Sequence, residues 1–160
     1  KMDMKELIVK EMMTEIDCKD FKPQRLLTLL GNQYCSLDEI ADCFRHVLRV
    51  VRREVYGRYD KTELKYLSVC EKGHTDGAKG HIHTLIEFDT EKMPIDDWVM
   101  LFRKVWMNTD NGIGLSLVTD KKLMKESWCK DVYDLNGAVS YLFKNSSGAG
   151  ENYLFVGSNY

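Results

Sequence analysis

The sequence predicts an α+β fold in which a central antiparallel β-sheet is flanked by helices. Short apolar runs typical of strands alternate with longer segments in which apolar residues recur every three or four positions. Two of the strand runs are separated by a Gly-rich connection, and hairpins mixed with helices in this way are typical of the fold class. The 160 residues contain no internal repeat or linker, so we expect a single domain over 1–160.

The first half of the chain predicts two helices and two strands. Apolar residues recur at helical spacing through the opening segment and again after Ser36, which forms a capping box with Glu39. The run RLLTLL between these helices is followed by Gly31 and Asn32, as expected of a buried strand. The expected elements are a helix over 4–16, a strand over 25–30, a helix over 36–56 and a strand over 63–71.

The second half begins with the strand that returns from the Gly-rich connection and closes a β-hairpin. Pro94 opens a further helix, and Asp134 is the expected N-cap of another. The expected elements are a strand over 81–88, a helix over 94–106, strands over 114–120 and 126–134, a helix over 135–145 and a strand over 153–158. After the opening helix the order is βαββαββαβ, which predicts a ferredoxin- or RRM-like βαββαβ core.

Composition indicates the setting in which the chain works. No segment approaches the run of about 18 apolar residues that a membrane helix needs, and the opening is too charged for a signal peptide. The five cysteines are odd in number and form no CxxC pair, which favours reduced thiols over disulfides. We therefore expect a soluble intracellular protein without a membrane partner.

Basic residues gather in one stretch of a chain whose net charge is −2. The negative sum argues weakly against a nucleic-acid partner. A run of this kind is usually the solvated face of a helix, and the alternative is a basic surface that contacts nucleic acid. The stretch comprises Arg45, Arg49, Arg52, Arg53, Arg58 and Lys61.

Two histidines stand two apart in an otherwise apolar strand. Side chains alternate along a strand, so His81 and His83 share one face. If the hairpin closes across the Gly-rich connection, Glu71 lies opposite His81 on that face. One carboxylate and two imidazoles suit Mn²⁺ or Mg²⁺ and leave positions for phosphate oxygens. The alternative is a pair of ordinary surface histidines; Glu87 and His74 are more distant candidate ligands.

The last predicted helix carries a candidate nucleophile. Tyr141 and Lys144 are three residues apart and therefore share a helix face. A nearby cation or metal-bound phosphate favours the phenolate, which makes tyrosine a useful nucleophile. The alternative is a half-buried tyrosine with its hydroxyl in water. Tyr133, which falls in the preceding strand segment, is a less favoured second nucleophile.

Three segments, RLLTLL, HIHTLIE and AVSYLFK, stand in the order of the three motifs of the HUH endonuclease superfamily. The chain resembles in particular the rolling-circle replication initiator (Rep) proteins that use one catalytic tyrosine. The resemblance implies that Glu71, His81 and His83 hold Mg²⁺ or Mn²⁺ and that Tyr141 attacks the scissile phosphate. A 5′-phosphotyrosine and a free 3′-OH would result, with Lys144 positioning the reacting groups or stabilising the phenolate.

The resemblance also implies the partners of such a nickase. Its substrate is expected to be single-stranded DNA, in or beside an origin stem-loop, where nicking and joining start rolling-circle replication with host replication proteins. The compartment would be the cytoplasm of a bacterium or the nucleus for a eukaryotic virus. Expected contacts with the DNA backbone come from Arg45, Arg49, Arg52, Arg53, Lys72 and Lys79.

Other functions fit parts of the same pattern. The sequence has no G-x-x-x-x-G-K-[ST], so no helicase ATPase is expected, and the chain is expected to be the nuclease domain of a longer protein. An HUH transposase or a relaxase shares the chemistry, although relaxases usually have a third histidine. A non-catalytic RRM-like nucleic-acid-binding module would not cleave, and a metal-dependent hydrolase that uses water would cleave without a covalent adduct.

Overall fold

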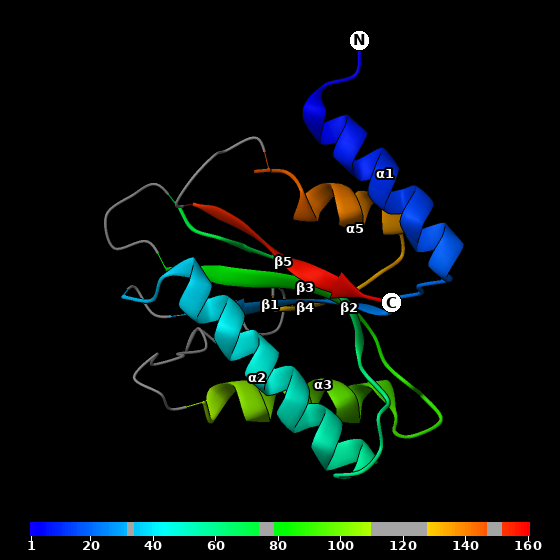
Figure 1. Ribbon diagram of the computed structural model, residues 1–160, viewed down its shortest axis with the longest axis vertical. Coiled ribbons are helices and arrows are strands. Elements are labelled where there is room, and N and C mark those ends of the chain that lie inside the picture. The colour runs from blue at the N-terminus through cyan, green and yellow to red at the C-terminus, as the bar shows by residue number, and fades with distance from the viewer. Residues whose placement is uncertain (32–33, 74–78, 110–127, 147–151) are drawn as a thin grey trace.

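Five strands form one antiparallel sheet with the order β4-β1-β3-β2-β5 (Figure 1). The computed structural model describes residues 1–31, 34–73, 79–109, 128–146 and 152–160. The described helices are α1 (Met4–Lys19), α2 (Leu37–Tyr56), α3 (Ile95–Met107) and α5 (Leu135–Leu142). The strands are β1 (Arg25–Leu30), β2 (Lys65–Glu71), β3 (His81–Glu87), β4 (Cys129–Asp131) and β5 (Tyr153–Asn159). The predicted α+β fold with a central antiparallel sheet is confirmed.

The connections between strands follow a ferredoxin-like pattern. Helix α2 links β1 to β2, a hairpin links β2 to β3, and α3 lies between β3 and β4 in the chain. The resulting βαββαβ unit places β1 and β3 at the centre of the order β4-β1-β3-β2. Strand β5 adds to the outer edge of β2. The predicted core is therefore present, with one further strand at its edge.

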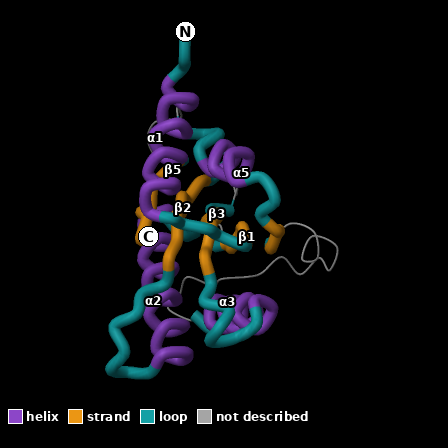
Figure 2. Tube along the Cα trace, turned by 90° about the vertical axis from the view of Figure 1, so that its right-hand side faces the viewer, coloured by secondary structure: helices purple, strands orange, loops and turns teal. Residues whose placement is uncertain are grey.

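Helices cover both faces of the sheet (Figure 2). On one face α2 and α3 pack on the even-numbered residues of β3, and on the other face α1 and α5 pack on its odd-numbered ones. The first layer encloses the larger apolar cluster, which includes Phe44, Trp98, Phe102 and Trp106. Within the described part of the chain, no helix is both long and apolar enough to cross a membrane.

Capping residues explain where the helices begin. In α2 the Ser36 side chain accepts the Glu39 backbone N–H, and the Glu39 carboxylate accepts the Ser36 N–H in return, as the sequence predicts. Asp134 caps α5 by accepting the N–H of Gly137 at 3.1 Å. Pro94 is the N-cap of α3.

Several predicted bounds differ from the structure at the C-terminal end. Within the described part of the predicted strand over 126–134, which begins at residue 128, β4 covers only Cys129–Asp131. Residues 126–127 and the predicted strand over 114–120 lie outside the described residues. The predicted helix over 135–145 ends at Leu142. The chain tightens there, because the backbone N–H of Lys144 bonds the carbonyl of Tyr141 instead of continuing the α-helical pattern.

Candidate metal centre

The hairpin register brings the predicted ligands together. Glu71 pairs with His81 across β2 and β3, which confirms the predicted register, and His83 lies two residues further along β3. The start of β3 is held against β1, where the N–H of Gly31 donates to the Gly80 carbonyl at 2.8 Å. A Cβ at Gly80 would lie 2.6 Å from a methyl carbon of Ile40, so a larger residue there would have to displace the end of this buried side chain.

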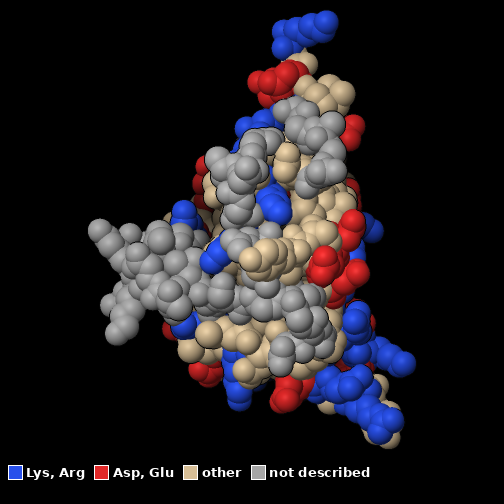
Figure 3. Space-filling model, turned by 90° about the vertical axis from the view of Figure 1, so that its left-hand side faces the viewer, with Lys and Arg blue, Asp and Glu red and all other residues tan. Residues whose placement is uncertain are grey.

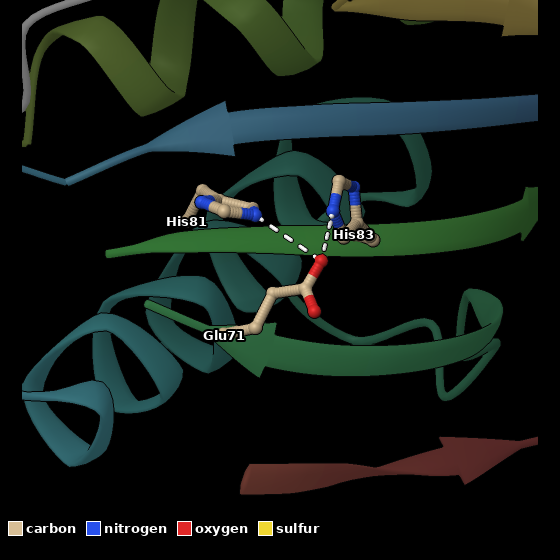
Figure 4. A group of neighbouring side chains, drawn as sticks. All are labelled: Glu71, His81 and His83. Carbon is tan, nitrogen blue, oxygen red and sulfur yellow. Dashed lines mark hydrogen bonds and ion pairs between the residues drawn. The ribbon is translucent and has the colours of Figure 1, made fainter. Parts of the chain in front are cut away.

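Both imidazoles reach the same carboxylate oxygen (Figure 4). The Nε2 atoms of His81 and His83 lie 3.2 and 2.7 Å from Glu71 Oε1. The three ligand atoms lie within 4.8 Å of one another. When metal–ligand bonds are about 2.1 Å long, neighbouring ligand atoms of an octahedral ion lie about 3 Å apart. The distances from Glu71 Oε1 to the two imidazole nitrogens are close to this separation. The group could therefore hold a metal ion.

Burial differs among the three side chains. The side chains of Glu71 and His83 are 3% exposed, whereas that of His81 is 26% exposed. A metal held here would sit at the boundary between the apolar core and solvent. The exposed side, next to His81, is where a substrate oxygen could complete the coordination.

The turn after α5 contributes two further contacts to Glu71. Lys144 Nζ lies 3.4 Å from Oε1, and the Asn145 side-chain amide donates to Oε2 at 2.6 Å. Lys144 is one of the residues singled out in the sequence, and the structure brings it to the predicted ligands. Asn145 carries no sequence signal, because its contact joins residues 74 positions apart.

Tyr141 lies directly beside the ligand group. Its ring packs edge-on against the ring of His83 with centroids 5.0 Å apart. The ammonium of Lys144 lies 3.9 Å from the centre of the tyrosine ring. The residue is 39% exposed, so it borders solvent beside the ligand group. Residues from β2, β3 and the α5 region thus meet at one place.

A second residue missed by the sequence analysis orients His83. Thr28 of β1 faces His83 in the sheet, and its Oγ1 lies 2.9 Å from Nδ1. In the hydrogen bond to the Glu71 carboxylate Nε2 carries the proton, and Nδ1 accepts from Thr28. Binding a metal through Nε2 would require the other tautomer, in which Nδ1 carries the proton and donates to Thr28. The β1–β3 register determines this contact, and no local pattern in RLLTLL reveals it.

The surroundings shift the pKa values of the buried groups in this centre. Burial would raise the pKa of the Glu71 carboxyl, but hydrogen bonds from His81, His83 and Asn145 outweigh burial and hold this pKa well below its usual range. Burial lowers the pKa of the His83 imidazole, against the hydrogen bond with Glu71, which raises it. An anionic carboxylate beside a neutral imidazole is the protonation state that a metal ion requires.

Other candidate residues lie away from the centre. The Glu87 carboxylate accepts the Lys22 N–H at the far end of β3. Tyr133 is 90% exposed, follows the end of β4, and donates its hydroxyl to Asp131. His74 lies outside the described residues. Unlike Glu87 and Tyr133, Lys72 and Lys79 lie within two residues of a predicted ligand in the chain. Lys72 directly follows Glu71 at the end of β2, and Lys79 stands two residues before His81 at the start of β3.

The structure does not bring the predicted arginines to the metal centre. They lie on α2, which covers the opposite face of the sheet. Arg45 bonds Asp42 and the Val156 carbonyl, and Arg52 bonds the Asp60 carbonyl. Arg49 and Arg53 are exposed. On the face in Figure 3, basic side chains gather most densely at the lower end, where α2 ends in Figure 1.

No protein-family model, curated protein or solved structure matches this chain. The arrangement of Glu71, His81 and His83 on an antiparallel sheet, with Tyr141 beside it, is therefore the basis on which a function can be assigned.

Proposed function

We propose that the protein is an HUH-type nickase that cuts and rejoins single-stranded DNA through a covalent bond to Tyr141. One observation carries the proposal: the ring of Tyr141 packs against His83, so a nucleophile from α5 lies beside a carboxylate–histidine group from β2 and β3. Metal ligands alone would suit many enzymes. A tyrosine held against them, with a lysine over its ring, favours transfer of a phosphoryl group to that tyrosine.

Glu71, His81 and His83 would hold Mn²⁺ or Mg²⁺, with one oxygen and two nitrogens as ligands. These residues supply too few ligands to fill an octahedral ion, so positions remain for phosphate oxygens. When bound, the metal supplies Lewis-acid polarisation of the scissile phosphate. Lys144 lies between Glu71 and Tyr141 and is placed to stabilise negative charge on the phenolate.

The proposed reaction exchanges one phosphate ester for another. The Tyr141 oxygen loses its proton and bonds to phosphorus, while the bond from phosphorus to the 3′ oxygen breaks. The 3′ oxygen takes up a proton, and the 5′ phosphate stays on the tyrosine. No oxidation or reduction occurs, and a later 3′-OH can reverse the step and join strands.

The substrate in this proposal is single-stranded DNA from an origin stem-loop, cut to start rolling-circle replication with host replication proteins. Lys72 and Lys79 adjoin the ends of β2 and β3 that carry the ligands, which favours them as contacts with the DNA backbone. The arginines of α2 would contact DNA only if it wraps to the opposite face. A transposase or relaxase would use the same centre on a different substrate.

The test is to incubate the protein with labelled single-stranded oligonucleotides carrying candidate stem-loops, with Mn²⁺ or with EDTA. We expect a covalent species on denaturing electrophoresis that requires Mn²⁺ and disappears in Tyr141→Phe. Tyr133→Phe is the matched control, because Tyr133 is another exposed tyrosine that does not touch the centre. This control should form the adduct as the wild type does.

The alternatives give different results in the same assay. Cleavage without an adduct, unchanged in Tyr141→Phe, would replace the proposal with a hydrolase that uses water. Binding that is equal in Mn²⁺ and EDTA, with no cleavage, would replace it with an RRM-like binding module.

A further inference from the structure

The turn that follows α5 holds both oxygens of the Glu71 carboxylate. Lys144 approaches Oε1, which the two imidazoles also approach, and Asn145 donates to Oε2. The two contacts differ in what happens when a cation arrives. A divalent ion at Oε1 repels the Lys144 ammonium, whereas the neutral amide on Oε2 can keep its hydrogen bond.

We propose that Asn145 is a positioning residue that makes Glu71 a one-oxygen metal ligand and ties the Tyr141 helix to it. This inference rests on the proposed metal site. With Oε2 engaged by the amide, Oε1 is the oxygen that faces His81 and His83. Without the amide, the carboxylate could rotate and offer both oxygens, or turn away from the imidazoles.

The location of Asn145 gives this contact a second consequence. Asn145 stands four residues after Tyr141, in the turn that follows α5, while Glu71 ends β2. At 2.6 Å the hydrogen bond is short, and its acceptor is a carboxylate that is only 3% exposed. The distance from the nucleophile to the metal ligands is thereby fixed through a contact between side chains, in addition to the apolar packing of Val139 and Leu142.

Two substitutions at this position separate positioning from a merely structural role. In Asn145→Ala the carboxylate loses its orienting donor, and we expect Mn²⁺ affinity to fall by about 10- to 100-fold. In Asn145→Asp a second carboxylate adjoins the first, so the metal-free melting temperature should fall. The added negative charge should keep Mn²⁺ binding at least about tenfold tighter than in Asn145→Ala.

The experiment measures Mn²⁺ affinity by isothermal titration calorimetry, and melting temperature with and without Mn²⁺, for the wild type and both variants. Asn136→Ala is the control, since Asn136 is on the same helix and its side chain accepts a hydrogen bond from Ser140. It should bind Mn²⁺ as the wild type does. Asn145→Asp should show a larger rise in melting temperature on adding Mn²⁺ than Asn145→Ala.

The outcomes distinguish this inference from the function it rests on. Wild-type Mn²⁺ affinity in Asn145→Ala, or equal losses in both Asn145 variants, would overturn the role of Asn145 and leave the metal site standing. A wild-type protein that binds no Mn²⁺ would overturn the metal site and the role of Asn145 together.

Discussion

The two faces of the sheet are built from different kinds of side chain. The face under α2 and α3 is apolar apart from the buried, hydrogen-bonded pair Ser68 and Thr84. Its Phe44, Trp98, Phe102 and Trp106 have essentially no exposed surface. The face under α1 and α5 has a smaller apolar cluster. The buried side chains of Glu71 and His83 lie on this same face, at one end of the sheet. Burying a charged carboxylate costs free energy, which the hydrogen bonds from His81, His83 and Asn145 offset at Glu71. The larger core therefore stabilises the fold by apolar burial, while the other face carries a polar centre held by its own hydrogen bonds.

Strand β3 shows this division within seven residues. Ile82 and Ile86 point into the larger core, and His81 and His83 point to the other face. Substitutions on the first face should change the free energy of unfolding, and those on the second should change metal binding and catalysis.

The largest effect is expected for Trp98→Ala. The side chain is fully buried, stacks on Phe88, and donates its indole N–H to the Asp89 carbonyl at 2.8 Å. Its loss leaves a cavity and should lower the free energy of unfolding by about 3–5 kcal/mol, measured by urea denaturation. The exposed Tyr59→Ala is the control and should change this free energy little. A similar fall in the free energy of unfolding of Tyr59→Ala would contradict the expected difference between buried and exposed residues.

A large effect on metal affinity, rather than on folding, is expected for Glu71→Gln. The amide keeps the shape of the side chain but removes the charge that both imidazoles and Lys144 approach. Mn²⁺ affinity should fall by more than about 100-fold in calorimetry, since removing a ligand's charge exceeds the effect of removing its supporting partner. The conservative Glu87→Gln should retain affinity, because Glu87 lies at the far end of β3. Unchanged binding in Glu71→Gln would show that the ion sits elsewhere.

A smaller loss of Mn²⁺ affinity, about tenfold, is expected for Thr28→Val. Valine keeps the volume but cannot hydrogen-bond Nδ1 of His83, so the imidazole loses the contact that fixes its orientation. Thr14→Val, on the exposed side of α1, is the control for the same chemical change. Equal affinities in the two variants would mean that packing alone orients His83.

The smallest effect is a loss of folding stability at alkaline pH, caused by Tyr56 on the α2 and α3 face. Burial, with the nearby charge of Asp89, raises the pKa of Tyr56 to about 12. An unfolded tyrosine has a pKa of about 10, so the folded state favours the protonated phenol. The resulting stabilisation is full below pH 10 and is lost as pH rises through about 12. Urea midpoints measured between pH 9 and 12 should fall less steeply in Tyr56→Phe than in the wild type, and parallel curves would contradict this assignment.

Much of the centre was predictable because strands and helices have fixed side-chain periods. Alternation places His81 and His83 on one face, and closing the hairpin symmetrically places Glu71 opposite His81, as the structure confirms. The three-residue spacing predicts Lys144 beside Tyr141, and the contact is present although Lys144 lies in the turn after α5 rather than on the helix. These relations depend only on local geometry and one short connection.

The contacts that were not predicted depend on how distant segments meet. Asn145 reaches Glu71 from the turn that follows the end of α5 at Leu142, and Thr28 reaches His83 through the β1–β3 register. The direction of the β1–α2–β2 connection determines which face of the sheet α2 covers. The run of arginines in α2 carries no information about that direction. The contact of those arginines with DNA stays a prediction.

The most direct test of the account is to locate the covalent bond by digesting the Mn²⁺-treated protein–oligonucleotide product and sequencing its peptides by tandem mass spectrometry. The account predicts a nucleotide mass on Tyr141, formed with Mn²⁺ and absent with EDTA. A nucleotide on Tyr133 or on any other residue, or cleaved DNA with no modified peptide, would contradict it.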